Sequence, residues 1–291
     1  MQITQRTTPL STVAPFSFDH SLTFLCSFPP TAGEQVIERR ALSKALAVDG
    51  RAHFVSVRET QGRLDCSVTS EGEIDDARLA RVIDRVRFQL SLDDDLEPFY
   101  APARADAAFA PLALRYHGHH HVKFPSAFEI AVWAVLAQRN MRLGRRIKDA
   151  IVAAFGPRIV IDGTEHRAFP EPHVLTEASE VRRVLRDDAK ADAIVTIART
   201  FRDLDVQRAL LAPSYDEADA FLRSLPRIGP WSSAFILFRG LGRMERLAER
   251  SDPILAAARR AYGPLPEREL RAIAERYGKW CGYWALYLRR S

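Results

Sequence analysis

The chain has 291 residues, 47% of them hydrophobic, which is enough to bury one large core or two ordinary ones. No stretch approaches the roughly 18 apolar residues of a membrane span, and no charged leader precedes an apolar core at the N-terminus, so we expect neither a membrane protein nor a signal peptide. Three scattered cysteines (Cys26, Cys66 and Cys281) argue against a disulfide framework and for the reducing cytoplasm. They are too few for a four-cysteine iron–sulfur cluster.

The net charge of +5 is unevenly distributed along the chain. Residues 1–110 contain 12 lysines and arginines against 16 acidic residues, whereas residues 111–291 contain 30 against 21. A basic part of this kind is typical of nucleic-acid binding, although an ordinary soluble surface explains the same charge equally well.

The first hundred or so residues predict an α+β unit with an antiparallel sheet. Residues 1–15 are polar and rich in Thr and Pro, which predicts a loose segment. Residues 22–28 predict a strand, and the apolar spacing over 34–47 predicts a helix.

The pattern continues with elements of clearer periodicity. Residues 53–58 and 63–68 alternate as half-buried strands joined by a turn at Gln61-Gly62, and 76–90 is a clean amphipathic helix. The acidic run beginning at Asp93 is interpreted as a solvated connector. We therefore predict an N-terminal domain over residues 1–110.

The cluster His117-Gly118-His119-His120-His121 raises the question of a metal site. The histidines lack helical HxxxH spacing and an accompanying set of cysteines or carboxylates, and Pro125 follows them in an expected loop. The sequence therefore favours surface loop histidines, which could lie near phosphates, and predicts no metal centre.

From Ser126 onward the chain predicts an all-helical domain over residues 111–291. Ser126 is an expected N-cap, and Gly156-Pro157 is a helix stop. Helices are expected over 126–138, 143–155, 177–185, 190–201, 216–224, 231–239, a stretch after 252, 267–277 and 280–288.

A tight turn between two of these helices organises the domain. Pro226 ends one helix, Gly229 permits close approach of another molecule, and Pro230 suits the first turn of the next helix. Such a turn points unpaired N–H groups outward, toward an anion such as a nucleic-acid phosphate.

The stretch from Leu225 to Ala234 resembles the helix-hairpin-helix of the DNA glycosylase superfamily, and Asp252 follows Trp231 by 21 residues, as the catalytic aspartate does in that family. Residues 93–100, 127–138, 169–172 and 279–288 resemble further segments of the AlkA-type 3-methyladenine DNA glycosylase II family. The resemblance implies a small antiparallel sheet domain packed on a larger helical domain, hence the fold class α+β.

The resemblance implies that Asp252 is the catalytic residue. A carboxylate beside the sugar stabilises oxocarbenium charge or orients an attacking water. Asp252 followed by Pro253 is also an ideal start to a helix, and an N-cap aspartate at a cleft can serve both roles.

Further site residues follow from the resemblance. Trp231 stands where relatives that also nick the strand carry a nucleophilic lysine, and it could stack on a flipped base or pack the hairpin. Phe235 and Gln138 fall at base-pocket positions. Arg139 falls at the wedge position that fills the gap in the duplex, where many relatives have an apolar side chain, and it could equally contact a phosphate.

The remaining positions concern the DNA backbone. Arg227, Ile228, Gly229 and Ser232 are expected to bind phosphates, and the carbonyls of Arg223, Leu225 and Ile228 could hold an optional monovalent cation. Arg227 replaces the usual glycine, which adds strain if that position needs a positive φ. Cys281 replaces a usual arginine, so the base preference of this chain could differ.

These observations predict a cytoplasmic, monomeric, monofunctional DNA glycosylase without a cofactor, nucleoid-associated if bacterial. It would bind double-stranded DNA with damaged bases and hydrolyse the N-glycosidic bond of flipped alkylated purines of the 3-methyladenine type. The alternatives are excision of deaminated or oxidised bases, a non-catalytic DNA-damage-binding protein, or a hairpin module that docks a partner protein.

Overall fold

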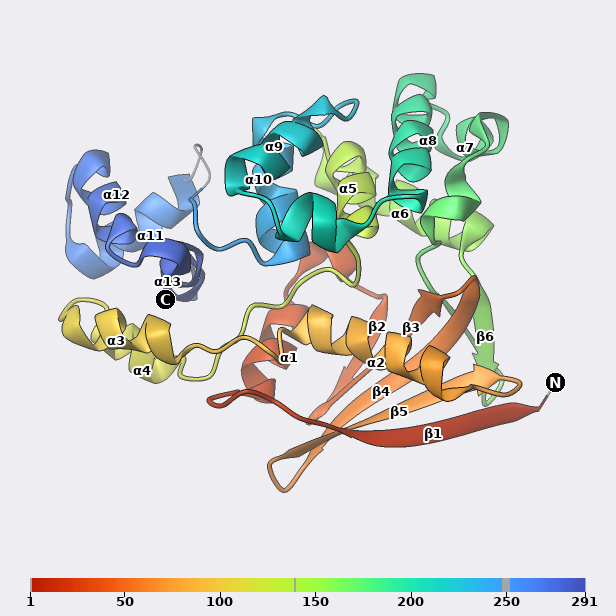
Figure 1. Ribbon diagram of the computed structural model, residues 1–291, viewed down its shortest axis with the longest axis horizontal. Coiled ribbons are helices and arrows are strands. Elements are labelled where there is room, and N and C mark those ends of the chain that lie inside the picture. The colour runs from red at the N-terminus through yellow and green to blue at the C-terminus, as the bar shows by residue number, and fades with distance from the viewer. Residues whose placement is uncertain (1, 139, 248–251, 291) are drawn as a thin grey trace.

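The computed structural model describes residues 2–138, 140–247 and 252–290, and it has the predicted α+β fold. A five-stranded antiparallel sheet with strand order β1-β5-β4-β3-β2 lies below a layer of helices (Figure 1). Its strands are β1 (Ile3–Leu10), β2 (Gln35–Glu38), β3 (Ala41–Val48), β4 (Arg51–Thr60) and β5 (Arg63–Glu71).

Three N-terminal predictions are wrong. The segment expected to be loose contains the edge strand β1, whose β-branched residues pair with β5 and whose Pro9 is tolerated at an edge. The strand expected at 22–28 is helix α1 (Phe18–Cys26), which Ser17 caps. The helix expected at 34–47 is strands β2 and β3, because β3 is a buried strand and a short apolar run does not distinguish the two structures.

The better-patterned elements are confirmed. Strands β4 and β5 pair in register around the Gln61-Gly62 turn, and α2 (Asp76–Leu90) covers one face of the sheet. Its apolar residues Val82, Val86 and Leu90 are buried, as the amphipathic pattern requires.

Among the residues that the structure describes after α2, the regular elements are helical apart from one hairpin, β6 (Arg158–Ile161) and β7 (Thr164–Arg167), which sequence patterning did not reveal. Ser126 caps α5 as predicted. The helices are α3 (Glu97–Ala105), α4 (Ala110–Arg115), α5 (Ala127–Leu136), α6 (Met141–Phe155), α7 (Ala178–Leu185), α8 (Asp188–Arg202), α9 (Tyr215–Ser224), α10 (Pro230–Phe235), α11 (Asp252–Tyr262), α12 (Glu267–Glu275) and α13 (Cys281–Leu288). Short 3-10 turns lie at Pro29–Thr31, Pro172–Leu175 and Gly278–Trp280, and π-helical turns at Gln207–Leu211 and Ile236–Gly240.

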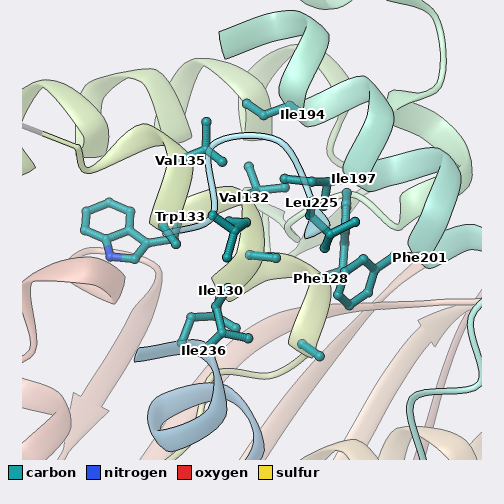
Figure 2. Packing of buried hydrophobic residues seen from close by; sticks show 14 of the residues in the cluster. Phe128, Ile130, Val132, Trp133, Val135, Ile194, Ile197, Phe201, Leu225 and Ile236 are labelled. Atoms are coloured by element: carbon teal, nitrogen blue, oxygen red, sulfur yellow. The ribbon is translucent and has the colours of Figure 1, made fainter. Parts of the chain in front are cut away.

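Three apolar cores hold these elements. The first lies between the sheet, α1 and α2. The second is built around α5 and α8, and Leu225 from the hairpin turn and Ile236 pack into it (Figure 2). The third joins residues 96–116 to the C-terminal helices. Because Leu225 is part of a core, the hairpin is fixed to the body of the helical layer.

The acidic connector is more than a solvated run. Asp94 accepts a hydrogen bond from the buried Tyr283 hydroxyl at 2.5 Å, and Asp95 accepts one from the Glu97 amide at 3.0 Å. Asp93 pairs with Arg87. The interpretation as a plain solvated connector is therefore wrong, because these carboxylates join α2, α3 and α13.

The histidine cluster is also placed differently from the prediction. His119, His120 and His121 are fully buried, and only His117 is exposed. His120 bonds to the carbonyls of Ser91 and Pro15, whereas the ring nitrogens of His119 and His121 have no described partner. No group of three His, Cys, Asp or Glu side chains among the described residues could hold a metal ion.

Burial of His119 predicts a pH-dependent stability. Desolvation, with nearby Arg290 adding to it, lowers the pKa of His119 to about 3, so the folded state holds the neutral ring while the unfolded chain takes up a proton near pH 6.5. The stability from this residue is complete above pH 6.5 and is lost as the pH falls, by about 1.4 kcal/mol per pH unit. Between pH 7 and 5, the free energy of unfolding measured in urea should therefore fall less steeply with falling pH for His119→Phe than for the native protein.

The exposed neighbour provides the matched control for this measurement. His117→Phe should leave the slope unchanged, since His117 lies at the surface. Equal slopes for the native protein and His119→Phe would contradict the burial argument. The window above pH 5 is chosen because carboxylates titrate mainly below it.

Candidate functional site

The hairpin turn joins α9 to α10. A capping box of Ser214 and Glu217 starts α9, and the turn closes when the Ile228 amide donates to the Leu225 carbonyl at 3.2 Å. Gly229 then caps α10, with Pro230 in its first turn. The turn conformation predicted from Pro226, Gly229 and Pro230 is therefore present.

Arg227 occupies the left-handed region, with a φ of 61°. Its backbone carbonyl accepts a hydrogen bond from Gln138 Nε2 at 2.7 Å, and its side chain donates to the Ala189 carbonyl at 3.2 Å. Gln138, expected in a base pocket, thus binds the hairpin turn. The contact secures a strained backbone that glycine would adopt freely.

Two substitutions at position 227 should isolate this strain. Both Arg227→Ala and Arg227→Gly lose the side-chain hydrogen bonds to the Ala189 carbonyl and to Gln138 Oε1, but only glycine relieves the positive φ. We expect the glycine variant to be more stable than the alanine variant by about 1 kcal/mol in urea denaturation. An alanine variant of equal or greater stability would refute the strain.

Gly229 differs from the other glycines that have ordinary φ values. A Cβ atom built on it meets nothing within 4 Å, and its φ is −91°. On the remaining members of this group a Cβ would come within 3.0 Å of another atom: Gly144, Gly156, Gly240 and Gly282. The packing of the chain therefore does not require glycine at 229, and the open space beside it would allow close approach of a second molecule.

Trp231 and Phe235 form a parallel aromatic stack on α10. Their ring centroids lie 5.2 Å apart and their planes differ by 7°. Phe235 also contacts the buried Phe124 edge-on, with centroids 6.4 Å apart. Trp231 is 51% exposed, so the stack is anchored at Phe235 and open at the tryptophan. It could extend by one more planar ring.

The remaining hairpin residues are less open. Ser232, expected at a phosphate, is buried, as is Ile228. The carbonyl of Leu225 already accepts the Ile228 amide, although a carbonyl has a second lone pair. The cation site at Arg223, Leu225 and Ile228 stays a prediction.

Asp252 is exposed and is the first residue of α11. No described residue forms a hydrogen bond or ion pair with its carboxylate. Six residues earlier in the chain, Arg246 pairs with Asp216 at 2.6 Å and lies over the Tyr215 ring. These contacts tie Arg246 to the first turn of α9, the helix that enters the hairpin.

The C-terminal helices hold α11 from its other end. Asp106 accepts hydrogen bonds from Tyr262 at 2.7 Å and Tyr277 at 3.0 Å, and Tyr262 in turn accepts the Trp284 indole N–H at 2.9 Å. Since Tyr262 is the last residue of α11, this network sets the axis of the helix that presents Asp252.

Cys281, noted in the sequence as a departure, has a structural position. Its thiol donates to the Met244 carbonyl at 3.2 Å, and the adjacent Gly282 amide donates to the same carbonyl at 2.7 Å. Burial raises the pKa of the Cys281 thiol to about 12. The residue therefore packs the segment leading to Asp252 and is not a reactive thiol.

The wedge position, Arg139, lies outside the described residues. The structure adds two neighbours that sequence reasoning missed, Met141 and Leu143, whose apolar side chains are half exposed in the first turn of α6. The available signal was two large apolar residues next to the wedge position on a helix that is otherwise strongly amphipathic.

Comparison with known proteins agrees with this geometry. No family model matches the chain. It is 25% identical over 214 residues to a DNA-3-methyladenine glycosylase of Bacillus subtilis, covering 70% of each protein. It is also 25% identical over 277 residues to a probable bifunctional transcriptional activator/DNA repair enzyme AlkA of Mycobacterium tuberculosis, and it spans only 54% of that protein.

Solved structures share the fold over nearly the whole chain. A 3-methyladenine DNA-glycosylase from Archaeoglobus fulgidus matches with a TM-score of 0.74 at 22% identity, covering 98% of this chain and 97% of the other. An 8-oxoguanine glycosylase/lyase of Clostridium acetobutylicum in complex with double-stranded DNA matches with a TM-score of 0.68 at 14% identity, covering 99% and 96%.

The chain shares its antiparallel sheet and its helical layer with these glycosylase structures. In sequence it is similar to the DNA-3-methyladenine glycosylase and AlkA proteins named above. The resemblance predicted from the hairpin and Asp252 is thereby confirmed.

Proposed function

We propose that the chain is a DNA glycosylase of base excision repair that releases alkylated purines from double-stranded DNA. The relatives named above support the general activity. The observation that carries the substrate class is the Trp231–Phe235 stack, half open to solvent beside the hairpin. A purine made cationic by alkylation is attracted to the face of an indole, so this stack favours it over an undamaged base.

Asp252 is the proposed catalytic residue. Alkylation makes the base a good leaving group, so the bond between base and sugar breaks with positive charge developing on the sugar. The Asp252 carboxylate stabilises that charge and orients the water that adds to the anomeric carbon. The products are the free base and an abasic site. The carboxylate is exposed and forms no hydrogen bond or ion pair with a described residue.

The residue at position 231 argues against strand cleavage. A glycosylase with lyase activity needs an amine that forms a Schiff base with the sugar. Trp231 occupies the corresponding position in this chain and has no amine. We therefore infer a monofunctional enzyme that leaves the strand intact.

Expulsion of the base requires something to fill the gap in the duplex. Arg139 is the proposed wedge, with the apolar Met141 and Leu143 beside it. Arg227 and the backbone at Ile228 and Gly229 are the proposed phosphate contacts, and the buried Ser232 would contribute through its backbone amide.

A panel of duplexes tests the activity directly. Each duplex carries one defined lesion, either an alkylated, a deaminated or an oxidised base, and hot alkali after incubation converts abasic sites to strand breaks. We expect breaks for alkylated purines only after alkali. Breaks before alkali would overturn the monofunctional assignment, and binding without base release would identify a damage-binding protein.

Gly229→Ala should separate DNA binding from folding. The Cβ atom meets no protein atom, so the urea midpoint should match that of the native protein. The same methyl group would hold a phosphate away from the backbone, and we expect the affinity for duplex DNA, measured by fluorescence anisotropy, to fall about tenfold. Unchanged affinity would contradict a phosphate contact at Gly229.

A further inference from the structure

A cavity of about 560 Å³ lies between the sheet and the helical layer, away from the hairpin and Asp252. Its lining includes residues of β3, α2, α5 and the end of α8. Its volume is in the range of small-molecule sites. None of its lining residues belongs to the hairpin or to α11, so the glycosylase site does not account for it.

The wall of this cavity is strongly aromatic. Four phenylalanines line it, contributed by α2, α5, the segment after β7 and α8: Phe88, Phe128, Phe169 and Phe201. Phe128 contacts both Phe169 and Phe201, with centroids 6.0 Å apart in each pair. A planar apolar ligand of one or two rings would bury its faces against such a wall.

A lysine without a direct partner also lines the cavity. Lys44 on β3 is 5% exposed, and no described residue lies within hydrogen-bond or salt-bridge distance of its ammonium group. The Nζ atom itself is not enclosed by protein atoms, so it reaches the cavity, where water or a ligand can accept its hydrogen bonds. Arg85 on α2, also in the lining, likewise has no ion pair with a described residue. No described protein group accepts a hydrogen bond from the Lys44 ammonium, so a ligand could supply the acceptor.

The start of α5 adds donors to the same cavity. Ser126, Ala127 and Phe128 line it, and α5 spans ten residues. Ser126 accepts only the Glu129 amide, at 3.1 Å, so the amides of Ala127 and Phe128 have no described acceptor. The helix dipole makes this end favourable for negative charge.

The acidic residues of the cavity limit the charge of a ligand. Lys148 holds Glu34 at 2.6 Å and Glu129 at 2.7 Å, so one lysine serves two carboxylates. The Lys44 charge balances the second of these two carboxylate charges, and it helps to lower the pKa of Glu34. The lining also holds Asp49, Asp84 and Glu171 against Arg81, Arg167 and Arg202, so Arg85 leaves room for one negative charge. A carboxylate fits this balance, whereas a doubly charged phosphate would be repelled by Glu34 and Glu129.

We propose that this cavity, which we call the interdomain cavity, binds an aromatic carboxylate. The carboxylate accepts hydrogen bonds from the Lys44 ammonium and the first amides of α5, and the ring system lies against Phe88, Phe128, Phe169 and Phe201. The proposal concerns a second site and does not depend on the glycosylase activity.

The test uses 2-naphthoate and its uncharged analogue 2-naphthamide as probes, titrated into the full chain by calorimetry. We expect saturable one-to-one binding of 2-naphthoate and at least tenfold weaker binding of the amide. Lys44→Met should weaken 2-naphthoate binding roughly ten- to a hundredfold, the range for a lost charge-assisted hydrogen bond, and leave the amide unaffected.

Matched variants and competitors make the result decisive. Lys279→Met removes a lysine from the far C-terminal part and should change nothing. If Lys44→Met fails to fold, Arg85→Met at the rim replaces it, with a smaller expected loss. Three results would each overturn the proposal: no saturable binding of 2-naphthoate, binding insensitive to both variants, or displacement of the probe by an undamaged DNA duplex.

Discussion

Asp252→Asn is expected to reduce base release from methylated duplex DNA by at least 10²–10³-fold, the range for losing one preorganised electrostatic group. The amide has nearly the same shape as the carboxylate and can still begin α11, so the fold should persist. What disappears is the negative charge opposite the developing oxocarbenium ion. Single-turnover release of free base, measured with enzyme in excess, isolates this step from DNA binding.

A second aspartate provides the control for this result. Asp188 is exposed and is the first residue of α8, as Asp252 is of α11. Asp188→Asn should keep full base release, and both variants should bind duplex DNA with native affinity. If Asp252→Asn retained native turnover, the carboxylate would serve only as a helix start, and the catalytic assignment would be lost.

Lys148→Met is expected to have the largest effect on stability. The Lys148 ammonium is fully buried and contacts Glu129, Glu34 and the Pro30 carbonyl. Burial opposes its charge, but the two carboxylates raise the pKa of Lys148 above its usual value. Removing the lysine breaks the ion pairs of both carboxylates in a largely buried site, and we expect a loss of about 3–5 kcal/mol in urea denaturation.

The companion variants identify the source of that loss. Lys148→Met combined with Glu129→Gln and Glu34→Gln removes both stranded charges, and most of the stability should return, because replacing a whole buried ion cluster is often nearly neutral. Lys190→Met on α8 is the control for a lysine outside the cluster. A loss below about 1 kcal/mol for Lys148→Met would show that water reaches the carboxylates.

Local sequence was sufficient for the elements whose signals lie within one turn or one helix. Ser126 as a cap, Gly156 as a stop and the alternation around Gln61-Gly62 all predicted the observed structure. The sequence left open whether Arg227 needs a positive φ, and the structure shows that it has one.

The wrong predictions share a different cause. Residues 34–47 have apolar residues at helical spacing, yet they form β2 and β3. Pairing with β4 and burial beneath the covering helices stabilise a strand there. The same holds for His119 and His121, which polarity alone places at the surface. Pairing and burial by distant segments decided these positions, and no local pattern records them.

The candidate site divides in the same way. The sequence by itself determined the hairpin, the aspartate 21 residues after Trp231 and the absence of a lysine at that position, since these depend on residue type and spacing. Only the tertiary structure decided that Gln138 secures Arg227, that Trp231 stacks openly on Phe235 and that Lys44 lines a cavity. These three features depend on how α5, α10 and the sheet pack against one another. Packing is an interaction between distant segments, so no single stretch of the chain specifies it.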